Sequence, residues 1–96
     1  MHGVVLSRRA ERDLHRVGNE DLARIGAALT ALAAGDANLD VKALAGTAPW
    51  LRLRVGDHRV LYRPIQPAEG AQPDARWLVA RIIHRRDLER AVATLE

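Results

Sequence analysis

A chain of 96 residues is long enough for one domain only, because so few apolar side chains cannot form two stable cores. Hydrophobic residues make up 48% of it and aromatic residues 3%, so we expect an aliphatic core, and the absence of cysteine excludes disulfides and thiolate chemistry. The net charge of +3 is unevenly spread: residues 1–49 carry six basic and six acidic side chains, whereas residues 50–90 carry nine arginines against five acids. This basic half favours an anionic partner.

The first seventeen residues predict a short strand followed by a helix. Residues 3–6 have a β-type composition and end at Ser7, a favourable helix N-cap. Behind this cap Ala10, Leu14 and Val17 recur at helical spacing. We therefore expect a first helix of about ten residues.

A second helix is predicted directly after the first. Asn19 is expected to cap it, and Gly35 lies where a glycine often follows the end of a helix. Its apolar stripe consists of Leu22, Ile25, Leu29 and Leu32. The two helices would form a hairpin with one apolar side, and residues 36–49 are expected to be a connector.

From residue 50 the hydrophobic period changes to two, which predicts a β-hairpin with Gly56 and Asp57 as its turn. This register places Arg54 opposite Arg59. One face of the hairpin then carries Leu51, Leu53, Val55, His58, Val60 and Tyr62. The other face carries Trp50, Arg52, Arg54, Arg59, Leu61 and Arg63.

The last third predicts a loop, a strand and a helix. Residues 66–75 have a loop composition, and residues 77–83 are apolar on both faces, as in a central strand. His84-Arg85-Arg86 follows at the end of this strand. Asp87 is expected to cap a final helix with Leu88, Ala91, Val92 and Leu95 along one side.

The arginines of the hairpin are the first candidate functional residues. Like charges directly opposite each other destabilise a hairpin, so the pair formed by Arg54 and Arg59 needs compensation. Screening of the two charges by solvent is one explanation. Because Arg52 and Arg63 share this face, the other explanation is that the face binds RNA, with arginines that contact phosphates and Trp50 as a surface on which a base stacks. A place in the core is the alternative for Trp50.

His84 is the candidate proton carrier. The neighbouring charges of Arg85 and Arg86 disfavour imidazolium, and a neutral imidazole can accept a proton. His58 has a similar neighbour in Arg59, but its position on the apolar face favours a structural role.

Several classes of protein are excluded by missing motifs. The sequence has no HExxH, no pairs of Cys or His ligands and no close group of carboxylates, so we expect no metal site. It has neither GxGxxG nor a P-loop, so we expect no nucleotide cofactor. Without a signal peptide or a membrane span, a cytoplasmic protein is expected.

The hairpin string RLRVGDHRVLYR at residues 52–63 and the closing HRRD at residues 84–87 resemble the RelE/ParE toxin superfamily. The resemblance extends over nearly the whole chain in element order and implies one toxin domain of residues 1–96. The implied fold is α+β: an N-terminal helical hairpin packed on one face of a small antiparallel β-sheet, with a short C-terminal helix.

The resemblance also implies a toxin of a type II toxin–antitoxin system that cuts messenger RNA on the ribosome, without metal, and so inhibits translation. Arg59 and Arg85 match the phosphate-binding arginines of the family, and Arg86 is the alternative to Arg85. The expected catalytic residues are Arg54, Arg59, His84 and Arg85, and the expected RNA-binding residues are Trp50, Arg52, Arg63 and Arg86.

This sequence departs from the family pattern at two places. Glu89 stands where the family often has a tyrosine, and Arg52 and Arg54 replace lysines. A ParE-like toxin that binds DNA gyrase without catalysis is therefore the alternative, and a plain basic RNA-binding domain is a third possibility. Both toxin branches imply an antitoxin partner whose acidic, partly disordered segment wraps the domain.

Overall fold

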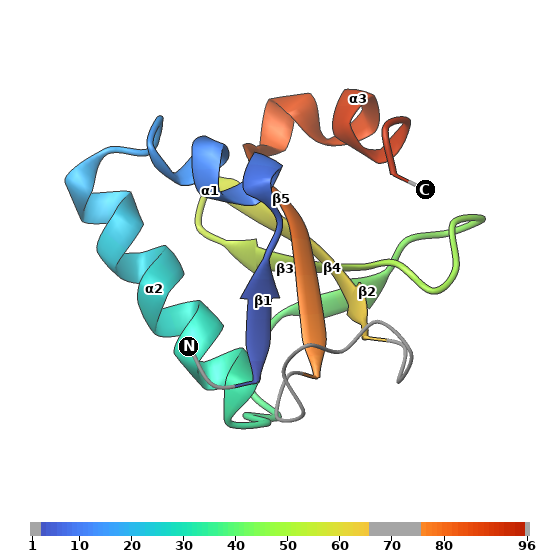
Figure 1. The fold of residues 1–96 in the computed structure, drawn as a ribbon, viewed down its shortest axis with the longest axis horizontal. Coiled ribbons are helices and arrows are strands. Elements are labelled where there is room, and N and C mark those ends of the chain that lie inside the picture. The colour runs from blue at the N-terminus through green and yellow to red at the C-terminus, as the bar shows by residue number, and fades with distance from the viewer. Residues whose placement is uncertain (1–2, 66–75, 96) are drawn as a thin grey trace.

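A computed structural model describes residues 3–65 and 76–95, which form a five-stranded sheet with helices on both sides (Figure 1). The strand order is β1-β5-β4-β3-β2, and the first strand is parallel to β5 while the other pairs are antiparallel. The strands are β1 (Val4–Leu6), β2 (Val41–Ala43), β3 (Leu51–Val55), β4 (His58–Pro64) and β5 (Trp77–His84). The expected α+β class is confirmed, and β5 is paired on both edges over its first residues, as a central strand requires.

The N-terminal helices are α1 (Arg8–Leu14), shorter than expected, and α2 (Asn19–Ala33). The Ser7 hydroxyl accepts the Ala10 N–H at 3.0 Å, so the predicted cap is confirmed. Asn19 is not a cap: Gly18 takes the extended cap conformation, which places Asn19 inside the first turn of α2. Gly35 follows the C-cap with a φ of 76°, which confirms the predicted helix end.

The predicted hairpin register is confirmed. Val55 lies opposite His58 and Arg54 opposite Arg59, and a register shift follows between Leu61 and Tyr62 where β4 meets β5. The connector expected at residues 36–49 is only partly correct, because it contains β2, which pairs with β3. The strand has only three residues and all of them are exposed, so its apolar–polar alternation is too short to predict a strand. The loop predicted at residues 66–75 lies outside the described residues.

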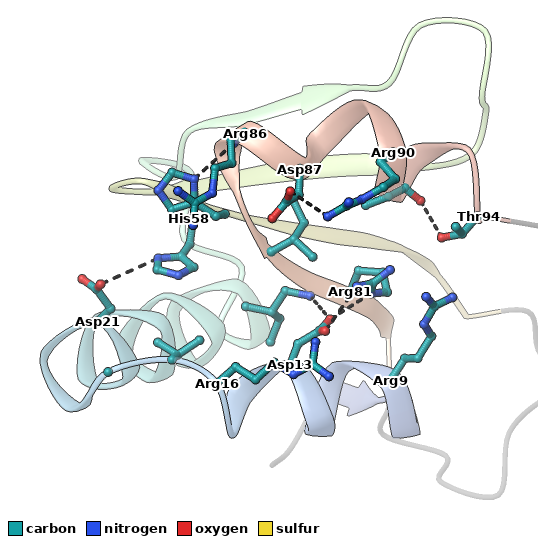
Figure 2. Close-up of a pocket in the computed structure, with 16 residues that line it drawn as sticks. Arg9, Asp13, Arg16, Asp21, His58, Arg81, Arg86, Asp87, Arg90 and Thr94 are labelled. Atoms are coloured by element: carbon teal, nitrogen blue, oxygen red, sulfur yellow. Dashed lines mark hydrogen bonds and ion pairs between the residues drawn. The ribbon is translucent and has the colours of Figure 1, made fainter.

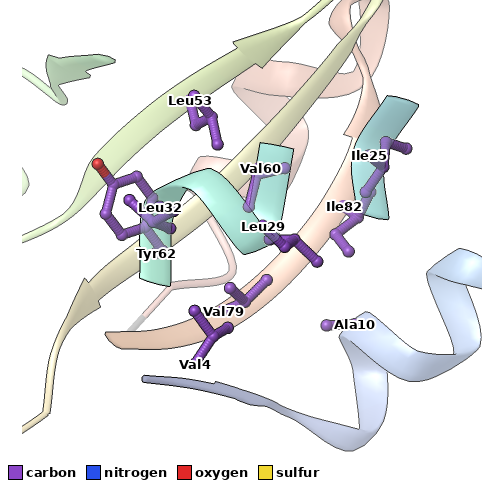
Figure 3. Close-up of a cluster of buried hydrophobic side chains, with 10 residues drawn as sticks. All are labelled: Val4, Ala10, Ile25, Leu29, Leu32, Leu53, Val60, Tyr62, Val79 and Ile82. Carbon is purple, nitrogen blue, oxygen red and sulfur yellow. The ribbon is translucent and has the colours of Figure 1, made fainter. Parts of the chain in front are cut away.

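The main core lies between the helical hairpin and the sheet, as Figure 3 shows. It consists of Val4, Ala10, Ile25, Leu29, Leu32, Leu53, Val60, Tyr62, Val79 and Ile82. The expected stripe of α2 is therefore confirmed from Ile25 onward. Leu22 is the exception: it belongs to the first turn of α2 and its residue is 38% exposed.

A second, smaller core lies on the opposite face of the sheet. There Leu61 and Ile83 pack against Ala91 of α3 (Leu88–Val92), with Leu44, Leu88, Val92 and Leu95 around them. The C-terminal helix thus covers part of the face that carries the hairpin arginines. Within the two described ranges, no helix is long and apolar enough to cross a membrane.

The predicted position of Asp87 at the start of the last helix is confirmed, because Asp87 directly precedes α3. Its carboxylate makes no cap hydrogen bond, however, and accepts one from the Arg90 guanidinium at 2.8 Å instead. A 3-10 turn (Arg85–Asp87) precedes α3, and its cap is His84, whose Nδ1 accepts the Arg86 N–H at 3.2 Å. The extra turn moves the start of the helical segment back to the histidine.

Candidate nucleic-acid interface

Four arginines form one electrostatic unit, which we call the arginine cluster: Arg52, Arg54, Arg59 and Arg85. Arg59 is central to it. Partial burial holds the pKa of its guanidinium below the ordinary value, and the charges of Arg54, Arg52 and Arg85 lower that pKa further, in this order, while Asp40 acts in the opposite direction. Cations of two strands and of the last turn therefore all act on Arg59.

The cluster is only partly neutralised by the protein itself. Arg59 donates to the carbonyl oxygens of Gly56 and His58, both at 3.0 Å, and these groups carry no charge. Asp40 lies 3.2 Å from Arg52, and Asp57 lies 3.5 Å from Arg85.

The pair of Arg85 and Asp57 is weak. Its side chains are 64% and 70% exposed, and ion pairs of this kind contribute little to stability. For Arg54 no ion pair exists within the described ranges, so four arginines face two carboxylates. This arrangement is suited to an external anion.

Trp50 and Arg63 lie beside the cluster and contact each other. The Arg63 guanidinium carbon is 5.6 Å from the centre of the Trp50 ring, within the range of a cation–π contact. Trp50 is only 5% exposed, so its ring offers little surface to a base. Its burial supports the core interpretation and argues against the RNA-stacking role that the sequence suggested.

His84 does not face the arginine cluster. It lies opposite His58 in the register of β4 and β5, and the ring centres are 5.9 Å apart. Because side chains alternate along a strand, His58 and Arg59 point to opposite faces of the sheet. The expected catalytic set is thus divided: Arg54, Arg59 and Arg85 come together, and His84 lies on the side of the helical hairpin.

The hydrogen bond of His84 also limits its chemistry. Its Nδ1 accepts the Arg86 N–H, so in the neutral ring the proton is on Nε2. In this form the exposed nitrogen is a donor. His58 lies beside the helical hairpin, since its Nδ1 is 3.9 Å from a carboxylate oxygen of Asp21 in α2.

The pair of Asp13 and Arg81 was missed from the sequence. Asp13 is 8% exposed and accepts hydrogen bonds from Arg81 Nε at 2.9 Å, Arg81 Nη2 at 3.3 Å and the Ile82 N–H at 2.9 Å. A signal was present: Asp13 stands three residues after Ala10 and four before Val17, within the apolar stripe of α1. A charge on the buried side of a helix needs a partner, here supplied by a strand 68 residues away.

A cleft of about 700 Å³ lies between α1 and the C-terminal helical segment (Figure 2), and we call it the α1–α3 cleft. Its walls include Arg9 of α1, Arg16 of the turn that follows it, His58, His84 and Arg86. Figure 2 shows the pair of Asp13 and Arg81 between the two walls. Arg86 thus faces this cleft, whereas its neighbour Arg85 belongs to the arginine cluster.

Comparisons with known proteins agree with this architecture. Residues 4–89 match the family model described as the ParE toxin of the type II toxin–antitoxin system parDE. Among solved structures, the RelB–RelE antitoxin–toxin complex from Methanococcus jannaschii contains a similar chain, with a TM-score of 0.70, 18% identity and coverage of 91% of this chain and 96% of that one.

Two other solved structures are similar. The archaeal RelE–RelB complex from Pyrococcus horikoshii OT3 has a TM-score of 0.63 and 20% identity, with 88% and 94% of the two chains covered. The RelBE2 toxin–antitoxin complex from Mycobacterium tuberculosis has a TM-score of 0.56 and 28% identity, with 88% of this chain and 98% of that chain covered. A comparison with curated proteins gave no match.

Proposed function

The chain belongs to the family of ParE toxins of type II toxin–antitoxin systems. For this member of the family, we propose that it inhibits translation by cutting messenger RNA on the ribosome. The observation that carries the proposal is the arginine cluster, in which three further arginines act on Arg59. Such a concentration of guanidinium groups matches the phosphates of RNA in charge and in hydrogen-bonding geometry. The similar solved chains are components of RelE complexes, which is consistent with this branch of the family.

The reaction would follow the metal-free route that the family resemblance implies. The ribose 2′-hydroxyl loses its proton to a solvent water as its oxygen attacks the adjacent phosphorus, and the bond from phosphorus to the 5′-oxygen breaks. The 5′-oxygen takes up a proton from water, so the products are a cyclic phosphate and a free 5′-hydroxyl. Negative charge grows on the phosphoryl oxygens as the reaction proceeds. Arg59 and Arg85 would stabilise this charge, while Arg52 and Arg54 would hold neighbouring phosphates.

His84 has no part in this proposal as a general base. It lies on the opposite face of the sheet from Arg59, and its Nδ1 already accepts a hydrogen bond. Catalysis would therefore depend on the stabilisation of charge by preorganised arginines rather than on a histidine.

The position of His84 favours a second candidate function, a ParE-like toxin that binds DNA gyrase without catalysis. Such a toxin needs a binding surface but no group that transfers protons. The arginine cluster would then contact acidic side chains of the enzyme, and the departures at Glu89, Arg52 and Arg54 would have no catalytic consequence.

An antitoxin is the partner proposed in both cases. The similar solved chains come from complexes with RelB antitoxins. An acidic antitoxin segment that folds on binding would neutralise the cluster and block access to it.

The experiment is induction of the toxin in cells, followed by mapping of messenger RNA 5′ ends and a gyrase supercoiling assay. We expect cleavage within codons, reduced about 100-fold or more by Arg59→Ala and by Arg85→Ala, as for loss of a transition-state donor. Arg24→Ala is the control for the loss of one positive charge, since Arg24 lies on α2, outside the cluster, in an exposed ion pair with Glu20 at 3.9 Å. Intact messages with inhibited supercoiling would overturn the proposal in favour of the gyrase inhibitor.

A further inference from the structure

The α1–α3 cleft contains more positive than negative charge, and two of its three carboxylates are paired with arginines inside it. Its cations are Arg9, Arg16, Arg81, Arg86 and Arg90, and its carboxylates are Asp13, Asp21 and Asp87. Asp13 is bound by Arg81 at 2.9 Å, Asp87 by Arg90 at 2.8 Å, and Asp21 lies 3.9 Å from His58.

Three guanidinium groups of the cleft are left over. Within residues 3–65 and 76–95, the side chains of Arg9, Arg16 and Arg86 have no ion pair, and all three residues are exposed. They come from opposite walls: Arg9 from α1, Arg16 from the turn that follows α1, and Arg86 from the turn before α3. In Figure 2 the Arg9 side chain extends from α1 toward the C-terminal helical segment.

The cleft adjoins the arginine cluster. Arg85 belongs to the cluster and the next residue, Arg86, lines the cleft, so the two sites meet at the end of β5. A strand that leaves Arg59 and Arg85 and passes round this end of the sheet reaches the cleft next. The half-buried rings of His58 and His84 also line it and are of a type on which bases stack.

We propose that the α1–α3 cleft is a second phosphate-binding site, in which Arg9, Arg16 and Arg86 hold the continuation of the RNA strand bound at the arginine cluster. The inference rests on the proposed action on RNA and adds the path of the strand. The cleft is lined mostly by charged and polar side chains, which suits a nucleic-acid backbone better than an amphipathic protein segment that needs apolar anchors.

The test is a binding measurement by fluorescence anisotropy with the full chain and a 2′-O-methyl RNA of about ten nucleotides, which cannot be cleaved and is long enough to span two sites. The double variant Arg9→Ala/Arg16→Ala is expected to raise the Kd about tenfold. Loss of two phosphate contacts should also lower the slope of log Kd against log salt by about 1.4.

The matched control is Arg12→Ala/Arg24→Ala. It removes the same charge, again includes a residue of α1, and both side chains lie outside the cleft. A general effect of net charge would weaken RNA binding equally in both double variants, and this result would overturn the second site. Thermal unfolding of each variant shows whether the fold is intact.

The two proposals fail in different ways. If messages stay intact in cells but Arg9→Ala/Arg16→Ala weakens RNA binding beyond the control, the nuclease is overturned and the cleft stands. If messages are cut and the double variant binds RNA like the control, only the cleft is overturned. A double variant that loses affinity for an acidic antitoxin peptide but not for RNA would also overturn the cleft as an RNA site.

Discussion

Arg81 and Arg59 lie on the neighbouring strands β5 and β4, but only the charge of Arg81 is neutralised by a carboxylate. Arg81 forms two hydrogen bonds with the nearly buried carboxylate of Asp13. Arg59 donates to two backbone carbonyls and has three arginines in its electrostatic surroundings. The fold therefore compensates the first charge and leaves the second one largely uncompensated.

This difference separates arginines that are neutralised within the fold from arginines that are available to an external partner, in a chain that uses arginine for almost every cation. A guanidinium matched by a buried carboxylate is part of the folded structure, and its removal leaves a buried charge without a partner. A guanidinium among like charges destabilises the fold slightly and gains its partner from outside. The sequence alone does not distinguish the two kinds.

The largest effect is expected when the compensated charge loses its partner. Asp13→Ala should lower the free energy of unfolding by about 3–5 kcal/mol, because Arg81 and the Ile82 N–H both lose their acceptor. Urea denaturation measures this loss. The exposed neighbour Glu11→Ala is the control, and an equal effect of the two changes would contradict the role given to Asp13.

A smaller effect is expected when a rise in pH deprotonates the buried Tyr62 and creates a charge without a partner inside the fold. Burial raises the pKa of Tyr62 above its usual value. Above a pH of about 10 the unfolded state then loses this proton before the folded state does, so stability falls as pH rises through the folded-state pKa, by up to about 1.4 kcal/mol per pH unit.

Tyr62→Phe isolates this contribution, because it keeps the ring and removes the titrating group. Urea denaturation between about pH 8 and 11, the range that contains the usual pKa of the phenol, should show a steeper loss of stability with pH for the wild type than for the variant. Parallel curves would show that burial does not raise the pKa of Tyr62 in the folded protein.

The smallest effect is expected in the arginine cluster itself. Arg54→Gln removes a like charge directly opposite Arg59 and should raise the free energy of unfolding by about 0.5 kcal/mol at low salt. The gain should vanish at about 1 M salt, where the charges are screened. Arg24→Gln serves as control, and a loss of stability in Arg54→Gln would mean that Arg54 has a stabilising partner.

Local patterns predicted much of the fold. The period of two and the turn at Gly56-Asp57 gave the correct register for every pair of the hairpin, and Ser7 and Gly35 marked helix boundaries correctly. Asn19 also has a suitable side chain, but Gly18 takes the cap position of α2, and Asp87 precedes α3 without a cap hydrogen bond. Capping propensity does not determine which of several adjacent residues takes the cap conformation.

The candidate site was predicted only in part, because its geometry depends on contacts between distant segments. The opposed pair of Arg54 and Arg59 followed from the register, and Arg85 joins it through the tertiary structure. The position of His84 on the other face depends on how β5 pairs with β4, and the partner of Asp13 lies on a strand far along the chain. Sequence spacing contains neither relation.

The contact of Asp13 with the Ile82 N–H also has a consequence for self-association. The first strand pairs with β5 only as far as Val79, and beyond it the Ser7 hydroxyl donates to the Ala80 carbonyl while Asp13 accepts the Ile82 N–H. Side chains of the N-terminal segment thus occupy backbone groups that a strand of another molecule would need. A neutral, apolar residue in place of Asp13 would open this edge to intermolecular β-pairing and aggregation.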